Sequence, residues 1–183
     1  MLNIGIIGPD FLVNKNKEIL QEKNCLVIDL QEKKQLRQVD GIIITGWKEK
    51  DYEFKIKQWV KELKMIEKEG TVILGIAHGA VAMGQNGRLK LMDYWTKSLP
   101  IIPKYLPLEI SSLDHVRFTA YFLLDIRFIQ VAPNLGILCS DKQYGAVILR
   151  QGNYLACSYV AELTNKTYLY DYWLEMVLSA KMT

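Results

Sequence analysis

The chain has 183 residues, of which 50% are hydrophobic and 23% are charged, so it can bury a sizeable core without a disulfide or a metal. This composition excludes a disordered chain. The formal net charge is only +3, and the lysines of residues 48–68 alternate with acidic side chains, which argues against a nucleic-acid partner.

The first half of the sequence alternates apolar runs typical of buried strands with patterns typical of helices. Strands are predicted at residues 2–7, 25–30, 39–44 and 71–74, and helices at 14–23, 51–69 and from Ala80 onward. Strands that alternate with helices form a parallel sheet with helices on both faces. We therefore expect an α/β protein with three layers and a doubly wound, mostly parallel sheet.

The pattern changes after Gly84, where Pro100, Pro103 and Pro107 interrupt the chain. Shorter strands, some of them antiparallel, are predicted at residues 118–122, 128–131, 135–139, 146–149 and 154–158, before a closing helix at 165–181. The sequence contains no repeat or low-complexity linker, so we expect one domain spanning residues 1–183.

Several classes of protein are disfavoured by what the sequence lacks. The longest weakly polar stretch, residues 71–84, is shorter than the ~20 residues that cross a bilayer, and the start lacks a basic leader, so we expect a cytoplasmic protein without a membrane partner. Cys25, Cys139 and Cys157 are widely spaced and predict buried, reduced thiols rather than metal ligands. Gly5 and Gly8 are too closely spaced for a dinucleotide fingerprint. We expect neither metal nor cofactor.

Candidate site residues lie where predicted strands end, because loops converge over a crevice at the carboxyl ends of parallel strands. Three such segments are residues 45–49, 75–79 and 158–164. In the middle segment, Gly75 and Gly79 flank a turn from strand to helix, as in nucleophile elbows that hold a reactive side chain in a pocket. The residue at the centre of this turn is Ala77, which carries only a methyl group.

The sequence resembles the class I, triad-type glutamine amidotransferases, and most closely the glutaminase subunit of pyridoxal phosphate synthase. The resemblance spans nearly the whole chain and is carried by residues 3–7, 39–44, 91–93, 150–159 and 162–164. Its most specific part is Arg-Gln-Gly at 150–152 followed by Cys-Ser at 157–158 and Glu-Leu-Thr at 162–164. The resemblance implies a flavodoxin-like fold and a single amidotransferase-like domain.

The same resemblance implies that the catalytic residues have been lost. The family's nucleophilic cysteine falls on Ala77 and its general-base histidine on Val160, whereas the orienting glutamate is kept as Glu162. A thiolate must attack the glutamine amide, and an imidazole must activate that thiol. Trp47 stands where the family has a glycine, and the family's substrate-binding arginine falls near Leu124. We therefore expect no intact catalytic residue and no glutaminase activity.

The remaining candidates form a possible ligand pocket of Gly46, Trp47, His78 and Glu162. Trp47 is interpreted either as a plug that fills the vacated substrate site, which we favour, or as an aromatic platform for a new ligand. Cys157 is interpreted as a core thiol and not as a substitute nucleophile.

Three functions remain open at this stage. The first is a catalytically inactive amidotransferase-like protein that acts as a binding, regulatory or scaffold subunit, with a synthase or a second copy of itself as partner. The second is an enzyme with altered chemistry in the same crevice, using His78 and Glu162 as acid and base. The third is an active glutaminase that supplies ammonia to pyridoxal phosphate synthesis.

Overall fold

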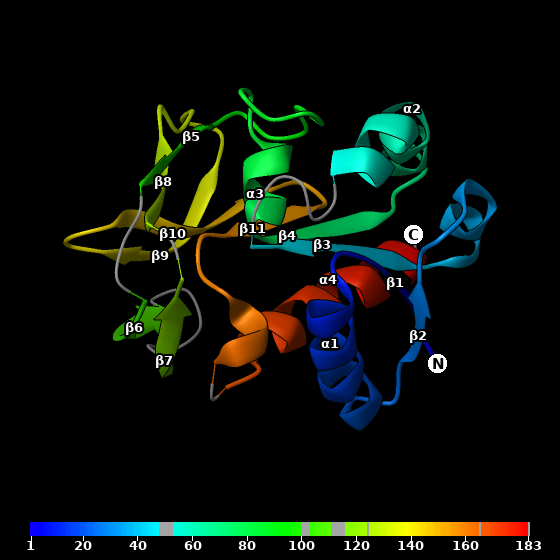
Figure 1. Cartoon of the computed structure of the whole chain (residues 1–183), viewed down its shortest axis with the longest axis horizontal. Coiled ribbons are helices and arrows are strands. Elements are labelled where there is room, and N and C mark those ends of the chain that lie inside the picture. Colours follow the sequence, from blue (N-terminus) through cyan, green and yellow to red (C-terminus); the bar gives the residue numbers. More distant parts are fainter. Residues whose placement is uncertain (48–52, 100–102, 111–115, 124, 165, 183) are drawn as a thin grey trace.

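The computed structural model describes residues 1–47, 53–99, 103–110, 116–123, 125–164 and 166–182 (Figure 1). Within this part of the chain, the main sheet has seven strands. They are β1 (Asn3–Ile7), β2 (Leu26–Asp29), β3 (Gly41–Gly46), β4 (Val72–Ala77), β9 (Gly136–Asp141), β10 (Gly145–Gln151) and β11 (Tyr154–Cys157).

The spatial order of the strands is β2-β1-β3-β4-β11-β10-β9. The first five of these strands are parallel to one another, and β10 and β9 continue the sheet in antiparallel pairing. This arrangement confirms the predicted α/β fold with a mostly parallel sheet and antiparallel strands in the C-terminal half.

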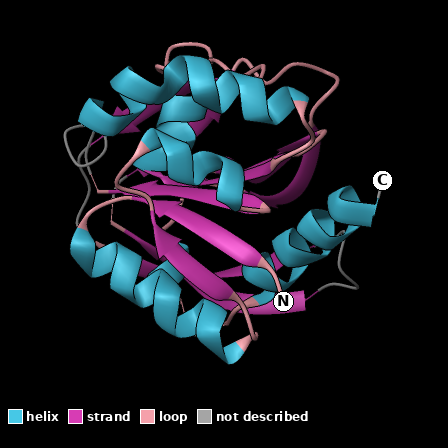
Figure 2. Ribbon diagram, turned by 90° about the vertical axis from the view of Figure 1, so that its right-hand side faces the viewer, coloured by secondary structure: helices cyan, strands magenta, loops and turns pink. Residues whose placement is uncertain are grey.

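Helices cover both faces of the sheet (Figures 1 and 2). They are α1 (Asp10–Glu22), α2 (Glu53–Lys68), α3 (His78–Met83), α4 (Tyr168–Met182) and the 3₁₀ helices η1 (Lys33–Gln38) and η3 (Ala161–Leu163). In Figure 1, α1 and α4 lie below the sheet, and α2 and α3 lie above it.

The alternation of side chains along each central strand creates two cores. Ile43 faces the core that α1 and α4 cover, whereas its neighbours Ile42 and Ile44 face the core under α2 and α3. Because successive side chains of a strand point to opposite faces, a fully apolar strand requires helices on both sides. The three predicted layers follow from this pattern.

Two small antiparallel sheets lie beside the main sheet. One pairs β5 (Trp95–Leu99) with β8 (Asp125–Ile129), and the other pairs β6 (Lys104–Ile110) with β7 (Val116–Phe122). We predicted neither β5 nor β6. Pro107 lies within β6, which is possible because a two-stranded sheet consists of edge strands that tolerate a missing N–H donor.

Other boundaries also differ from the prediction. Helix α1 begins at Asp10, directly after Pro9, and not at residue 14. Strand β4 continues through Ala77, past the predicted end at residue 74, and α3 then begins at His78. A proline before the first turn suits a helix start, which explains the earlier beginning of α1.

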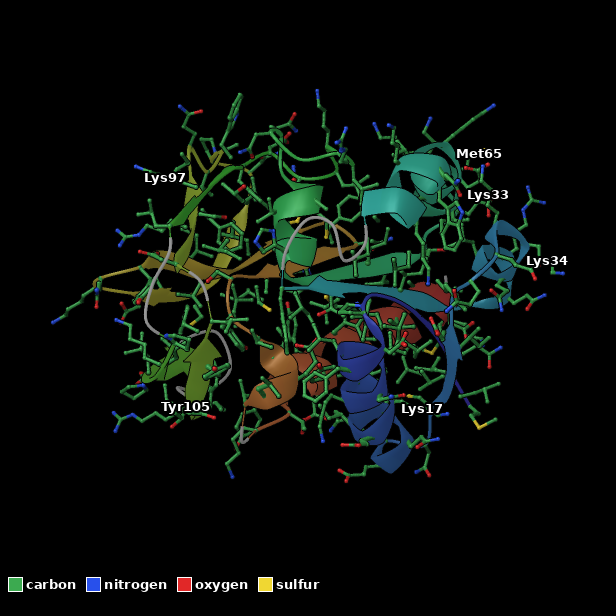
Figure 3. All side chains as sticks on the ribbon, in the orientation of Figure 1. Lys17, Lys33, Lys34, Met65, Lys97 and Tyr105 are labelled. Atoms are coloured by element: carbon green, nitrogen blue, oxygen red, sulfur yellow. The ribbon has the colours of Figure 1, made fainter. Side chains whose placement is uncertain are left out.

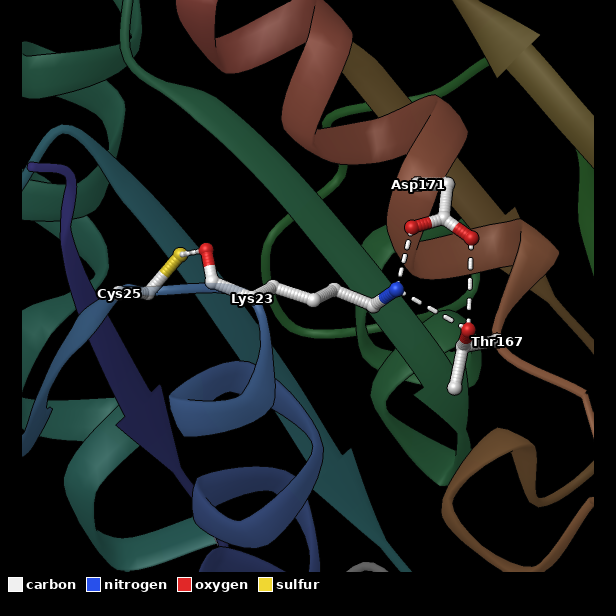
Figure 4. Close-up of polar contacts among 4 residues, drawn as sticks. All are labelled: Lys23, Cys25, Thr167 and Asp171. Atoms are coloured by element: carbon white, nitrogen blue, oxygen red, sulfur yellow. Dashed lines mark hydrogen bonds and ion pairs between the residues drawn. The ribbon is translucent and has the colours of Figure 1, made fainter.

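A polar cluster joins the end of α1 to the start of α4 (Figure 4). Lys23 is the residue directly after α1. Its Nζ atom donates to Thr167 Oγ1 at 3.0 Å and also forms an ion pair with Asp171. Thr167 Oγ1 in turn donates to Asp171 Oδ2 at 3.3 Å. Because α1 and α4 cover the same face of the sheet, this cluster fixes how the two helices lie against each other.

None of the described helices combines the length and the apolar character needed to cross a bilayer. Among the same residues, no group of three or more His, Cys, Asp or Glu side chains could hold a metal ion.

Candidate functional site

The turn between β4 and α3 has an unusual backbone at Ala77. This residue adopts φ 52° and ψ −114°, a conformation that costs of order 1–3 kcal/mol for a non-glycine residue. Two positions on, a Cβ atom at Gly79 would lie only 1.8 Å from the carbonyl oxygen of Ile44 in β3, so only glycine permits this close approach. The chain therefore keeps a strained strand-to-helix turn although Ala77 presents no reactive group.

Strand register brings the predicted segments together at one edge of the sheet. Gly46, the last residue of β3, is the register partner of Ala77. On the other side of β4, Cys157 of β11 pairs with Ile76. The carboxyl ends of β3, β4 and β11 are thus adjacent, as we predicted from the order of the elements.

Glu162 lies close to this edge in a buried hydrogen-bond network. Its Oε1 atom accepts a hydrogen bond from Asn16 Nδ2 of α1 at 2.8 Å and a second one from Thr45 Oγ1 of β3. Asn16 Oδ1 accepts from the hydroxyl of Tyr170 in α4 at 2.8 Å. The side chain of Asn16 also donates to the carbonyl of Leu12 at 2.8 Å. Glu162 therefore links η3 to α1, β3 and α4.

The surroundings of Glu162 disfavour a charged carboxylate. Burial raises the pKa of this group, although the hydrogen bonds from Thr45 and Asn16 act in the opposite direction. Its second oxygen, Oε2, is buried and has no hydrogen-bond partner among the described residues. Only 5% of the residue is exposed, so a ligand in the crevice has little access to the carboxyl group.

Val160, at the position of the family's base, belongs to the core. It is 1% exposed, and its backbone N–H donates to the carbonyl of Tyr121 in β7 at 2.9 Å. The neighbouring ring of Tyr159 packs against Phe118 and Phe122, with centroid distances of 5.6 and 6.0 Å. This segment is held by apolar and backbone contacts rather than by polar side chains.

Cys157 is a buried thiol beside the turn. Desolvation raises its pKa well above the usual range, and the negative charge of Glu162 acts in the same direction. Its Sγ atom lies 3.5 Å from the carbonyl oxygen of Tyr159, to which it donates. A thiol in this environment resists forming a thiolate, which agrees with its interpretation as a core residue.

Trp47 follows β3 and is partly exposed. The residue is 37% exposed, and its ring packs against that of Phe11 with a centroid distance of 5.5 Å. Phe11 is itself 49% exposed, so the pair forms an aromatic surface at the carboxyl edge of β1 and β3. This exposure disfavours the plug interpretation, because a plug would be a buried side chain.

His78 is half-buried and is the first residue of α3, directly after Ala77. Of the other candidates, Lys48 and Glu49 of the loop after Trp47 lie outside the described residues, as does Leu124.

We did not predict Asn16 and Thr45 as partners of Glu162, nor Tyr170 as a partner of Asn16. Asn16 and Glu162 are 146 positions apart, so no local pattern connects them. One signal was available: Asn16 is a polar residue on the buried side of an amphipathic helix, and such a residue requires a hydrogen-bond partner.

The fold and this turn define a three-layer α/β protein with an elbow-like strand-to-helix corner. No family model matches the chain. It is 23% identical over 192 residues to pyridoxal 5'-phosphate synthase subunit PdxT of Thermotoga petrophila, covering 96% of this chain and 100% of that protein. It is 26% identical over 188 residues to the subunit of the same name of Shouchella clausii, covering 96% and 95%.

Solved structures agree with the sequence relatives. A crystal structure of a glutamine amidotransferase superposes with a TM-score of 0.83 at 21% identity, covering 95% of this chain and 98% of that one. The structure of PurLQS from Thermotoga maritima gives a TM-score of 0.67 at 13% identity, with 98% and 97% coverage. The chain is therefore similar in sequence to PdxT subunits over nearly its whole length, and it has the fold of a glutamine amidotransferase.

Proposed function

We propose that this chain is a catalytically inactive amidotransferase-like protein that acts as a binding, regulatory or scaffold subunit. The observation that carries the proposal is the methyl group of Ala77 on a backbone strained like a nucleophile elbow. An amide donor needs a thiol at this position to form a thioester. Loss of one member of such a catalytic unit costs about 10⁴-fold or more in rate, and Val160 removes a second member.

The nearest remaining thiol and carboxyl group offer no replacement chemistry. Cys157 and Glu162 are buried, and burial raises the pKa of both groups. An enzyme of altered chemistry that uses His78 and Glu162 would need both side chains within about 3 Å of one ligand position. The bonds from Asn16 and Thr45 to Glu162 disfavour this alternative.

We propose a synthase subunit or a second copy of the chain as the partner, with a link to pyridoxal phosphate synthesis. The support is the similarity to proteins named as subunits of pyridoxal 5'-phosphate synthase. We also propose that residues 1–183 form one domain and that the protein is cytoplasmic. Its described cysteines are all free thiols, as is usual in a reducing compartment.

Ammonia release from glutamine tests the loss of catalysis. We expect purified protein to release no more ammonia than buffer alone does, with or without a pyridoxal phosphate synthase. We also expect mass spectrometry to find no adduct on the wild-type chain after incubation with 6-diazo-5-oxo-L-norleucine, an electrophile that mimics glutamine. The matched positive control is Ala77→Cys combined with Val160→His, which restores the two missing groups.

Turnover by the wild-type chain that disappears in His78→Ala or Glu162→Gln would show that the site is an enzyme after all. An adduct on Cys157 would show that this thiol acts as a nucleophile and would contradict the proposal. Co-sedimentation of the chain with a pyridoxal phosphate synthase tests the partner separately, because an inactive subunit can still form the complex.

A further inference from the structure

A cavity of about 440 Å³ lies between the C-terminal half of α2 and the segment that follows α3. It is distinct from the crevice near Ala77, because one of its lining residues, Tyr154, is the first residue of β11 and pairs with Ile73 near the start of β4. The cavity is therefore at the amino ends of the parallel strands, and Ala77 is at their carboxyl ends. Its volume lies in the range of small-molecule sites, ~300–1,000 Å³.

Four lysines from two separate segments line this cavity. Lys61, Lys64 and Lys68 are spaced three and four residues apart, so they share one face of α2. Lys90 approaches from the segment after α3 and has φ 51°. Backbone hydrogen bonds hold this residue on both sides, from Leu89 N to Ala82 O and from Leu91 N to Met83 O, each 2.8 Å long.

The positive charge of the cavity is only partly balanced, since the pKa of Glu62 is lowered by Lys33 and also by Lys61. None of its four lysines forms an ion pair with a described carboxylate, whereas Lys33 of η1 pairs with Glu62 of α2 at 2.8 Å. The whole chain has a formal charge of +3, so without these four lysines the remainder would carry 3 − 4 = −1. Like charges gathered in one concavity repel each other, and a bound anion relieves that repulsion.

The other residues that line the cavity are Met65, Leu91 and Tyr154, whose side chains are largely apolar. Together we call them the floor of the cavity. Tyr154 is only 8% exposed, whereas Met65 is 42% exposed and points outward from α2 (Figure 3). A ligand that fits this cavity therefore needs an anionic group for the lysines and an apolar group for the floor.

We propose that this cavity binds a small organic phosphate ester with an apolar or aromatic portion. Lysine ammonium groups bind phosphate as compact point charges. Lysine is depleted at protein–protein interfaces, so four of them favour a small anion over a protein partner. A nucleic acid would instead need a basic track longer than one cavity.

Isothermal titration calorimetry with 1-naphthyl phosphate tests the proposal on the full chain. We expect saturable binding with one site per chain, weakening as salt is added, and no comparable binding of neutral 1-naphthol. Lys64→Gln combined with Lys68→Gln should weaken binding by about tenfold, since two charged contacts are lost. The matched control is Lys57→Gln, which changes an exposed lysine of the same helix outside the cavity.

A second variant separates the floor from the charges. Met65→Ser changes an exposed side chain, so the fold should persist, and it should weaken binding of 1-naphthyl phosphate but not of tripolyphosphate. The proposal is overturned if 1-naphthol binds as well as its phosphate, or if the double lysine variant binds as tightly as Lys57→Gln. Binding only to phosphatidylglycerol vesicles or to an oligonucleotide, and not to the soluble ester, would also overturn it.

Discussion

Glu162 has a structural role at a position to which the resemblance assigns a catalytic one. Its carboxyl group is held by Asn16 and Thr45, and its side chain is buried. A buried hydrogen-bonded group is costly to disturb, because removing one partner leaves the others unsatisfied. The hydrogen bonds of Glu162 therefore give it a structural role that does not depend on catalysis.

The raised pKa of Glu162 predicts a pH dependence of stability. The folded-state pKa exceeds the ordinary value of 4.5, so the folded chain binds this proton more tightly than the unfolded chain does. The resulting stabilisation is complete below about pH 4.5 and is lost as the pH rises through the folded-state pKa. Each pKa unit between the folded and the unfolded state corresponds to about 1.4 kcal/mol of unfolding free energy.

Glu162→Gln should remove this component, because glutamine has nearly the same shape and does not titrate. We measure the free energy of unfolding with urea at a series of pH values. As the pH rises, we expect the variant to become more stable relative to the wild type. Glu22→Gln on the exposed side of α1 is the control. Parallel profiles for the wild type and Glu162→Gln would contradict the prediction.

At the scale of elements, two polar links of different kinds join α1 to α4. The Asn16–Tyr170 hydrogen bond is buried, whereas the ion pair of Lys23 with Asp171 leaves the Asp171 side chain 48% exposed. Water competes for the exposed link but has no access to the buried one. The two links should therefore contribute unequally to stability, although they hold the same pair of helices.

Tyr170→Phe and Lys23→Gln measure this difference. Tyr170→Phe leaves Asn16 Oδ1 without its donor, which should cost about 1–3 kcal/mol of unfolding free energy in urea denaturation. Lys23→Gln should cost ~1 kcal/mol or less and respond to salt, since surface ion pairs are weak and screened. Equal losses in the two variants would show that the exposed link is stronger than its surroundings indicate.

For the whole molecule, the sequence was most informative where one strong pattern decides the structure. The buried strands β1, β3 and β4 are continuous apolar runs, and α2 has a clear helical period, so the three layers could be predicted. The proposed loss of catalytic groups rests on two single positions, Ala77 and Val160. These predictions need only local information.

Features that depend on contacts between distant segments could not be predicted in the same way. Strand β5 has a single buried residue, Thr96, and β6 contains Pro107, so neither shows the alternation typical of a strand. The partners of Glu162, Asn16 and Thr45, come from two other elements, α1 and β3. The position of Trp47 depends on its contact with Phe11, which no spacing in the sequence indicates.

The small sheet of β6 and β7 shares a core with the main sheet. Phe122 of β7 is fully buried and stacks on Tyr144, which lies just before β10, with a centroid distance of 4.7 Å. The same ring also contacts Tyr159, just after β11. Because these aromatic side chains join the two sheets, we expect them to unfold together.

Denaturation therefore should proceed in a single transition, with far-UV circular dichroism and tryptophan fluorescence giving the same midpoint. Phe122→Ala should lower the unfolding free energy of the entire chain by about 3–5 kcal/mol, because it leaves a cavity in the shared core. Tyr105→Ala in β6 is the control, since Tyr105 is 63% exposed and its loss should matter far less. If Phe122→Ala instead produces a separate early transition that spares the tryptophan signal, the small sheet is an independent unit and the chain is not one domain.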